Sequence, residues 1–365
     1  MKPISRRKFL ELCAASAATL GLSQTLLPEL AEALNGVLQK KPTVLWIQGA
    51  ACSGCSMSLL NSVHPDLKAL LTEIINLRHH PQLGGVSGQS ALEHLRQAAE
   101  QARGKFLLIV EGAVPTAAGG NYCTVGVDAQ GQAITFQALV KDLAAKASLV
   151  MAVGTCAAYG GAAAAKPNPT GCKGLNALVD AEKLINVPGC PPHPDWIVGT
   201  LAHLVMYGRP EVDDFGRPKM FYGGVVHDNC PRRQYFDNST FALTFGEPGC
   251  LLEVGCKGPM TFADCSLRQW NGGTNWCIRS GSPCISCTHP EFPAGSLPLY
   301  GRMERISFAG IKVTADTVGK LAGTATALGI GAHLAGNIIK GRVGILKKGV
   351  QRGGDTVDKT GAGPN

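Results

Sequence analysis

Eight side chains of the types that bind soft or borderline metals lie between residues 227 and 287. They are one histidine and seven cysteines: His227, Cys230, Cys250, Cys256, Cys265, Cys277, Cys284 and Cys287. A cubane iron–sulfur cluster is held by four such ligands, usually thiolates and occasionally an imidazole. Eight ligands make two sets of four, so this stretch could hold two clusters.

Little in the same stretch would fold without bound clusters. The segment from 265 to 287 includes the turn sequences Asn271-Gly272-Gly273 and Gly281-Ser282-Pro283 and has almost no apolar periodicity. Clusters would have to supply the missing core. Three other uses of these cysteines stay open: disulfide bonds, zinc sites with an imidazole or a fourth thiolate, and simple burial of thiols.

The first half of the chain has the pattern of an α/β fold. Apolar runs without alternation predict four buried strands, at 44–47, 106–110, 149–153 and 184–187. Helical stretches separate these runs, the first of them at 57–63. Buried strands that alternate with helices are typical of a parallel sheet covered on both faces, so we predict that architecture.

Four more cysteines follow the carboxyl ends of three predicted strands: Cys52, Cys55, Cys156 and Cys190. Ligands of open α/β sheets gather at that edge, and the glycines beside these cysteines would let the backbone approach a bulky inorganic core. The four thiols could therefore converge on one site. The alternative is a redox dithiol of the thioredoxin type at Cys52 and Cys55, which leaves the other two cysteines unexplained.

The bulk numbers limit the classes of function. A length of 365 residues has room for two domains, and the formal charge is +8. Residues 301–365 account for +6 of that charge and residues 1–33 for +1, so the body of the chain is close to neutral. A nucleic-acid-binding footprint is therefore not supported.

The N-terminus has the features of an export signal. Ser5-Arg6-Arg7-Lys8 precedes a mildly apolar run, and Ala31-Glu32-Ala33 resembles a cleavage site. Paired arginines in this position predict a twin-arginine signal peptide over residues 1–33, recognised by the twin-arginine translocase. The alternative is an amphipathic first helix. Cys13 would be removed with the signal, and Cys123 and Cys172, which have no partners at ligand spacing, are expected to be buried or loop thiols.

Seven motifs occur in an order that identifies a family. They are Arg6-Arg7, Cys52-Ser53-Gly54-Cys55, Glu111-Gly112-Ala113-Val114-Pro115, Gly154-Thr155-Cys156-Ala157, Pro188-Gly189-Cys190-Pro191-Pro192, His227-Asp228-Asn229-Cys230-Pro231 and Pro283-Cys284-Ile285-Ser286-Cys287. With them the chain resembles the small, electron-transferring subunit of nickel–iron hydrogenases over nearly its whole length. The resemblance implies a flavodoxin-like, doubly wound domain over 34–210, an irregular iron–sulfur domain over 211–300 and a C-terminal tail over 301–365.

The resemblance also implies three clusters in a row and assigns their ligands. A proximal [4Fe–4S] cluster would be held by Cys52, Cys55, Cys156 and Cys190. A distal [4Fe–4S] cluster would be held by His227, Cys230, Cys250 and Cys256, and a medial cluster by Cys265, Cys284 and Cys287. Many members have proline in place of Cys277 and then hold a [3Fe–4S] medial cluster. Because Cys277 offers a fourth ligand here, we expect a [4Fe–4S] medial cluster, as in the selenium-containing subclass.

The function that the resemblance implies is hydrogenase activity in a heterodimer. Hydrogen would be split at a nickel–iron centre in the large subunit, and this chain would pass the electrons one at a time to an external quinone or cytochrome. The expected location is the periplasm, attached to the inner membrane beside a cytochrome or quinone-reducing partner. Two alternatives remain, a stand-alone multi-cluster electron-transfer protein and a zinc-stabilised interaction module.

The tail contains a long uncharged segment. Residues 321–339 carry no charge and lie between Lys320 and Lys340. Such a length could span a bilayer, with the following basic residues on the cytoplasmic side. The segment is rich in Gly, Ala and Thr and includes His333 and Asn337, so an interfacial or partner-packed helix is the alternative.

Overall fold

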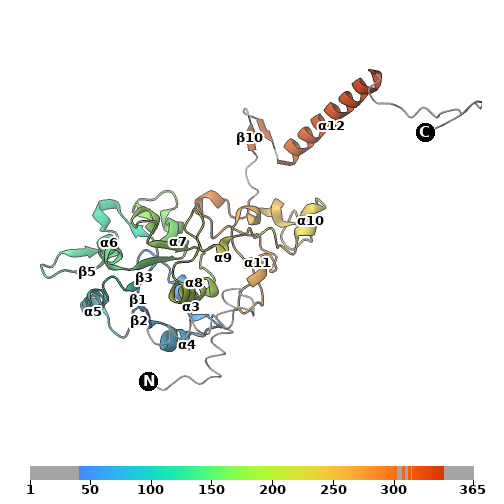
Figure 1. Cartoon of the computed structure of the whole chain (residues 1–365). Coiled ribbons are helices and arrows are strands. Elements are labelled where there is room, and N and C mark those ends of the chain that lie inside the picture. The colour runs from blue at the N-terminus through green and yellow to red at the C-terminus, as the bar shows by residue number, and fades with distance from the viewer. Residues whose placement is uncertain (1–40, 302–305, 309–310, 314, 341–365) are drawn as a thin grey trace, which may run out of the picture. The chain divides into compact units, whose positions relative to one another are not determined.

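The computed structural model describes residues 41–301, 306–308, 311–313 and 315–340. Contacts divide the chain into two compact units, Met1–Arg302 and Met303–Asn365 (Figure 1). The predicted signal peptide at 1–33 and the chain after residue 340 lie outside the described residues.

A five-stranded parallel sheet forms the centre of the first unit. Its strands are β1 Thr43–Gln48, β2 Asn76–His79, β3 Phe106–Glu111, β7 Leu149–Val153 and β9 Leu184–Val187. They lie in the order β2-β1-β3-β7-β9, so the direction of winding reverses between β1 and β3. The parallel sheet predicted from the apolar runs is confirmed, with a fifth strand, β2, that was not predicted.

The described residues also contain three short strand pairs and ten α-helices. The pairs are β4 Val114–Pro115 with β8 Cys172–Lys173, β5 Thr124–Val127 with β6 Ala133–Thr135, and β10 Ile306–Phe308 with β11 Ile311–Val313. The α-helices are α3 Gly54–Leu60, α4 Leu67–Ala69, α5 Gly88–Gln101, α6 Phe136–Lys146, α7 Thr155–Tyr159, α8 Pro194–Tyr207, α9 Lys219–Tyr222, α10 Arg233–Asp237, α11 Cys265–Arg268 and α12 Ala315–Ile339.

Alternate residues of each strand enter two different cores. In β1, Trp46 packs with α3, α4 and α8 on one face, whereas Leu45 packs with α5, α6 and α7 on the other. The first of these cores continues past residue 210 and includes Phe221, Leu251 and Trp276. The irregular second half of the unit is therefore anchored on one face of the sheet.

The end of β3 and the loop after β1 are held together by a close backbone contact. Ala50 and Ala113 exchange two backbone hydrogen bonds of 3.0 Å, directly before the loop that carries Cys52. Gly112 has φ +88°, and a Cβ there would lie 2.7 Å from the Cβ of Ala51 and 2.8 Å from the oxygen of Ala50. Only glycine fits this position without a shift of the loop.

Gly112→Ala is expected to lower the free energy of unfolding by about 3 kcal/mol, because left-handed strain and a backbone clash add together. Gly131→Ala is the matched control, since Gly131 has φ +75° but open space around its Cβ. The control should cost only about 1–2 kcal/mol. Denaturant unfolding measures both, and equal losses would contradict the role given to the close approach.

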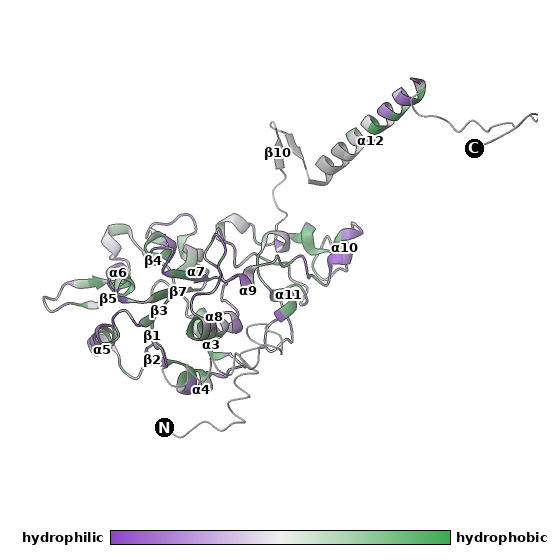
Figure 2. Ribbon diagram, viewed as in Figure 1, coloured by the Kyte–Doolittle hydropathy of each residue, from purple (hydrophilic) through white to green (hydrophobic). Residues whose placement is uncertain are grey.

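The second unit contains the β10–β11 pair and the long helix α12. The helix predicted at 321–339 lies within α12. Hydrophobic and hydrophilic residues are mixed along its coloured part (Figure 2). Among the helices that the structure describes, none combines the length and the apolar character required to cross a membrane.

Candidate metal centres

Four cysteines from separate segments line one cavity at the carboxyl edge of the sheet. Cys52 and Cys55 follow β1, Cys156 follows β7, and Cys190 follows β9. Parallel strands end at the same edge of a sheet, so residues distant in sequence meet there. The structure thus brings together the four cysteines to which the sequence assigned a proximal cluster.

The backbone around this cavity leaves room for sulfur. Gly154, the residue between β7 and α7, has φ +91°, and a Cβ on it would lie 2.5 Å from the Cys55 sulfur. Any larger residue would displace that thiol from the cavity. The space that glycine leaves beside the Cys55 sulfur fits a bulky inorganic group held by these four thiols.

The buried carboxylate of Glu111 positions Cys55. One carboxylate oxygen accepts hydrogen bonds from the backbone N–H groups of Cys55, at 3.1 Å, and of Ser56, at 3.3 Å. The other accepts from the indole N–H of Trp46 at 3.2 Å. The first turn of α3 is therefore fixed to the end of β3.

The thiol of Cys55 would resist ionisation on its own. Burial, followed by the charges of Glu111 and the other three thiols, raises the pKa of Cys55 far above its usual range. A bare group of thiolates in this environment is unfavourable. Metal binding removes the obstacle because it deprotonates coordinating thiols, so this donor set fits an iron–sulfur cluster.

A second group of thiols surrounds Cys265, the first residue of α11. Burial raises its pKa well above normal, and the charges of Cys287 and Cys284, then Asp264 and Cys277, raise it further. Cys284 is buried, whereas Cys277 is the most exposed of the four cysteines. All the thiols assigned to the medial cluster, Cys277 included, thus lie within electrostatic reach of Cys265.

The third group contains Cys230, Cys250 and Cys256, and the N–H of Cys230 donates to the carbonyl of His227, whose ring has an unsatisfied nitrogen. Burial raises the pKa of Cys250, and the thiols of Cys256 and Cys230 add to it. The Nε2 atom of His227 is buried and has no hydrogen-bond partner among the described residues. Its ring packs edge-on against Phe236, with centroids 4.7 Å apart.

The histidine is suited to bind metal. Burial, and then the nearby Arg233, lowers the pKa of His227, which favours the neutral imidazole. A buried ring nitrogen without a partner costs free energy, and a metal bond would satisfy it. In the described part of the chain, no three His, Cys, Asp or Glu side chains converge tightly enough to hold a single metal ion.

Backbone hydrogen bonds to sulfur connect the three groups in sequence. The N–H of Cys190, in the first group, donates to the thiol of Cys287, in the second, and lowers the pKa that burial raises there. The N–H of Cys284, in the second group, donates to the sulfur of Cys256, in the third, at 3.4 Å. The group around Cys265 is therefore the middle one. Thr155 reinforces the first junction, because its hydroxyl donates to the carbonyl of Cys287 and accepts from the N–H of Gly189.

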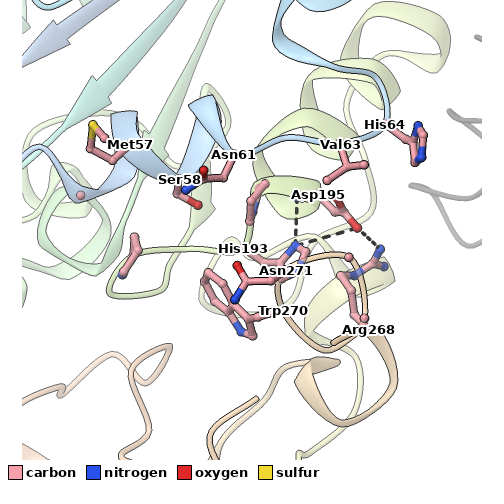
Figure 3. A pocket seen from close by; sticks show the side chains of 15 residues that line it. Met57, Ser58, Asn61, Val63, His64, His193, Asp195, Arg268, Trp270 and Asn271 are labelled. Carbon is pink, nitrogen blue, oxygen red and sulfur yellow. Dashed lines mark hydrogen bonds and ion pairs between the residues drawn. The ribbon is translucent and has the colours of Figure 1, made fainter. Parts of the chain in front are cut away.

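A cavity of about 650 Å³ lies beside the first two groups (Figure 3). Along its wall, His193 contacts the carbonyl of Gln269 at 2.7 Å through Nε2, and its Nδ1 accepts from the N–H of Asp195 at 3.0 Å. Arg268 pairs with the carboxylate of Asp195 at 3.0 Å. The start of α8, just after Cys190, is thereby tied to α11, which begins with Cys265.

This network was not predicted from the sequence. The sequence signal that was available is the pair His193-Pro194. Proline favours the first position of a helix, so the residue before it is expected to be the N-cap, as His193 is for α8. That pattern indicates a helix start but not the contact with Gln269 across the fold. The role of Glu111 was missed for the same reason, although its motif was noted.

Comparisons with known proteins agree with the motifs. A family model for the C-terminal part of NiFe/NiFeSe hydrogenase small subunits matches residues 222–300, and one for the 20 Kd chain of NADH ubiquinone oxidoreductase matches residues 52–204. The periplasmic [NiFeSe] hydrogenase small subunit of Desulfomicrobium baculatum is 48% identical over 312 residues, covering 81% of this chain and 98% of that protein.

Two further relatives extend the match. The quinone-reactive Ni/Fe-hydrogenase small chain of Wolinella succinogenes is 37% identical over 344 residues, covering 91% of this chain and 95% of that one. A solved structure of H2-activated [NiFeSe] hydrogenase from Dm. baculatum superposes with a TM-score of 0.69 at 49% identity, covering 72% of this chain and 100% of that chain. Identity and coverage at this level show that the chain belongs to the small subunits of nickel–iron hydrogenases.

Proposed function

We propose that this chain carries the electrons of hydrogen oxidation from a nickel–iron centre in a large-subunit partner, through three iron–sulfur clusters, to an external acceptor. The observation that carries the proposal is the order of the three thiol groups. Cys190 of the first group contacts Cys287 of the second, and Cys284 of the second group contacts Cys256 of the third. Clusters supply one-electron redox steps at potentials set by their ligands and surroundings.

Three sets of ligands follow from this proposal. The proximal [4Fe–4S] cluster is assigned to Cys52, Cys55, Cys156 and Cys190, and the distal [4Fe–4S] cluster to His227, Cys230, Cys250 and Cys256. The medial cluster is assigned as [4Fe–4S] to Cys265, Cys277, Cys284 and Cys287. The family resemblance implies a [4Fe–4S] medial cluster in the selenium-containing subclass. One relative of this chain is named as a [NiFeSe] small subunit, which supports the assignment of four medial thiols.

The domain assignments are part of the same proposal. A flavodoxin-like domain over 34–210 is supported by the strand order, which in chain order reads 2-1-3-4-5. Residues 211–300 form the irregular cluster-binding domain and residues 301–365 the tail. Residues 1–33 are assigned as a twin-arginine signal that directs the folded subunit to the periplasm, a location printed in the names of two relatives.

Attachment to the inner membrane is proposed through the tail. The described side chains of α12 include exposed Leu328, Ile330, Leu334 and Ile338. These residues suit an interfacial or partner-packed helix rather than the span that the sequence left open. A membrane cytochrome or a quinone-reducing subunit is the proposed acceptor, in keeping with the quinone-reactive relative.

Metal analysis of the purified protein tests the proposal. Coexpression with its large subunit should yield a nickel-containing heterodimer with roughly 12 cluster irons and as many labile sulfides per small chain, since each cubane contains four, beside the iron of the nickel–iron centre. A chain that purifies with its clusters but with no nickel-containing partner would favour the stand-alone electron-transfer protein. Zinc without sulfide would favour the interaction module and end the electron-transfer proposal.

His227→Cys should keep the distal cluster but lower its reduction potential, because a thiolate adds a negative charge where the imidazole is neutral. In Rieske centres two imidazoles in place of two thiolates raise the reduction potential by roughly 250 mV or more. Replacing one imidazole by a thiolate should therefore lower the potential by on the order of 100 mV. Redox-poised EPR measures the shift, and the proximal cluster provides the internal reference. An unchanged distal potential would show that His227 is not a ligand.

A further inference from the structure

Lys257 is a buried lysine located where two cluster sites meet. It follows Cys256 directly, and only 3% of its surface is exposed. Its backbone N–H donates to the carbonyl of Cys284 at 2.7 Å. The residue is thus attached both to a distal ligand, through the chain, and to a medial ligand, through a hydrogen bond.

The ammonium group is held in place by carbonyl oxygens. It donates to the oxygen of Gly255 at 2.8 Å and to that of Gly301 at 3.2 Å. Neither acceptor carries a full negative charge, so these bonds solvate the ammonium without neutralising it. Burial of a lysine is costly and uncommon.

The negative charge that matters to Lys257 belongs to the cysteines. The ammonium is bonded to the oxygen of Gly255, the residue directly before Cys256, and the backbone of the same lysine is bonded to Cys284. Lys257 therefore lies beside one proposed distal ligand and one proposed medial ligand. Charges in a poorly solvated interior interact much more strongly than charges in water.

We propose that the ammonium of Lys257 is a positioned positive charge that raises the reduction potentials of the medial and distal clusters together. A cluster gains one negative charge on reduction, and a nearby cation stabilises the reduced form. The proximal site lacks this neighbour, because Lys257 contacts only the other two groups through the bonds described. The charge would therefore favour movement of electrons away from the partner subunit. This inference rests on the proposed function.

The test is a redox titration of the three clusters by EPR in the intact heterodimer. Lys257→Gln removes the charge and keeps a hydrogen-bond donor, whereas Lys257→Arg keeps the charge. At a fixed applied potential, the Gln variant should show at least a tenfold lower ratio of reduced to oxidised medial and distal cluster, equivalent to about 59 mV for a one-electron couple. The proximal cluster should shift less, and the Arg variant should stay close to the unsubstituted protein.

Lys146→Gln is the matched control, because this lysine of α6 pairs with Glu100 and Asp142 away from the cysteines. It should leave all three potentials unchanged. Unchanged potentials in Lys257→Gln with all clusters present would overturn the inference while leaving the proposed function intact. Equal shifts in the Gln and Arg variants would overturn it as well, since packing and not charge would then be responsible. If Lys257→Gln does not assemble, Lys257→Met provides the same test of charge. Absence of clusters from the unsubstituted protein would refute the proposed function itself.

Discussion

Cys190→Ala is expected to eliminate the proximal cluster and reduce hydrogen-driven reduction of an external dye to background. Cys190 lines the first cavity with three other thiols, and its N–H bonds to the thiol of Cys287 in the next group. The substitution removes a proposed ligand of the proximal cluster and keeps the backbone N–H. Iron should fall from roughly 12 to roughly 8 per small chain, because one cubane is lost.

The loss of activity should exceed the roughly 10–100-fold that changes in the surroundings of metal ligands cause. Cys172→Ser is the control, because Cys172 is a buried thiol of β8 that contacts the hydroxyl of Thr170 and is not among the proposed ligands. It should keep full iron and activity. Full iron content in Cys190→Ala would remove this residue from the ligand set. Iron analysis, EPR and hydrogen-dependent dye reduction on the same preparations provide the measurements.

The sheet was predictable because its strands bury both faces. A short, continuous apolar run such as Phe106 to Val110 is typical of a buried strand. The predicted strand at 106–110 agrees closely with the observed β3. The strand β2 escaped prediction because it is short and polar, with the sequence Asn-Leu-Arg-His and alternating exposure. An edge strand is half solvated, so its sequence carries little of the signal that identifies a buried one.

The proximal cysteines were predictable from topology alone. Parallel strands end at one edge, so Cys52, Cys156 and Cys190 had to approach one another once the sheet was assumed. No such rule applied to residues 227–287, where the chain is mostly turns and short helices. Their division into a medial and a distal set came from the family resemblance, and spacing alone left it open.

The residues that support the ligands were the least predictable. His193 reaches Gln269 across 76 positions of sequence, and Glu111 reaches Cys55 across 56. Nothing in the sequence distinguished Lys257 from the other lysines of the chain. Contacts of this kind depend on how irregular segments pack, and the apolar pattern does not encode that packing.

Cys277→Pro is expected to convert the medial cluster from a [4Fe–4S] to a [3Fe–4S] form. The thiol of Cys277 contributes to the charges around Cys265 and Cys287, and proline has no ligand to replace it. The change should be tolerated by the backbone. The carbonyl of residue 277, which accepts from the N–H of Ser282 at 3.0 Å, is retained, whereas the N–H that proline lacks lies against the cysteine's own sulfur.

Iron in this variant should fall only from roughly 12 to roughly 11 per small chain, and an EPR signal of an oxidised three-iron cluster should appear. The medial potential should rise, because cluster type is one of the factors that set it. Cys277→Ser separates ligation from backbone effects, since a serine oxygen can still bind iron and the N–H is retained. A three-iron signal already present in the unsubstituted protein would contradict the ligand role of Cys277, and the medial cluster would then rest on Cys265, Cys284 and Cys287 alone. If the signal appears only after substitution, the exposed thiol of Cys277 is what keeps the fourth iron in place.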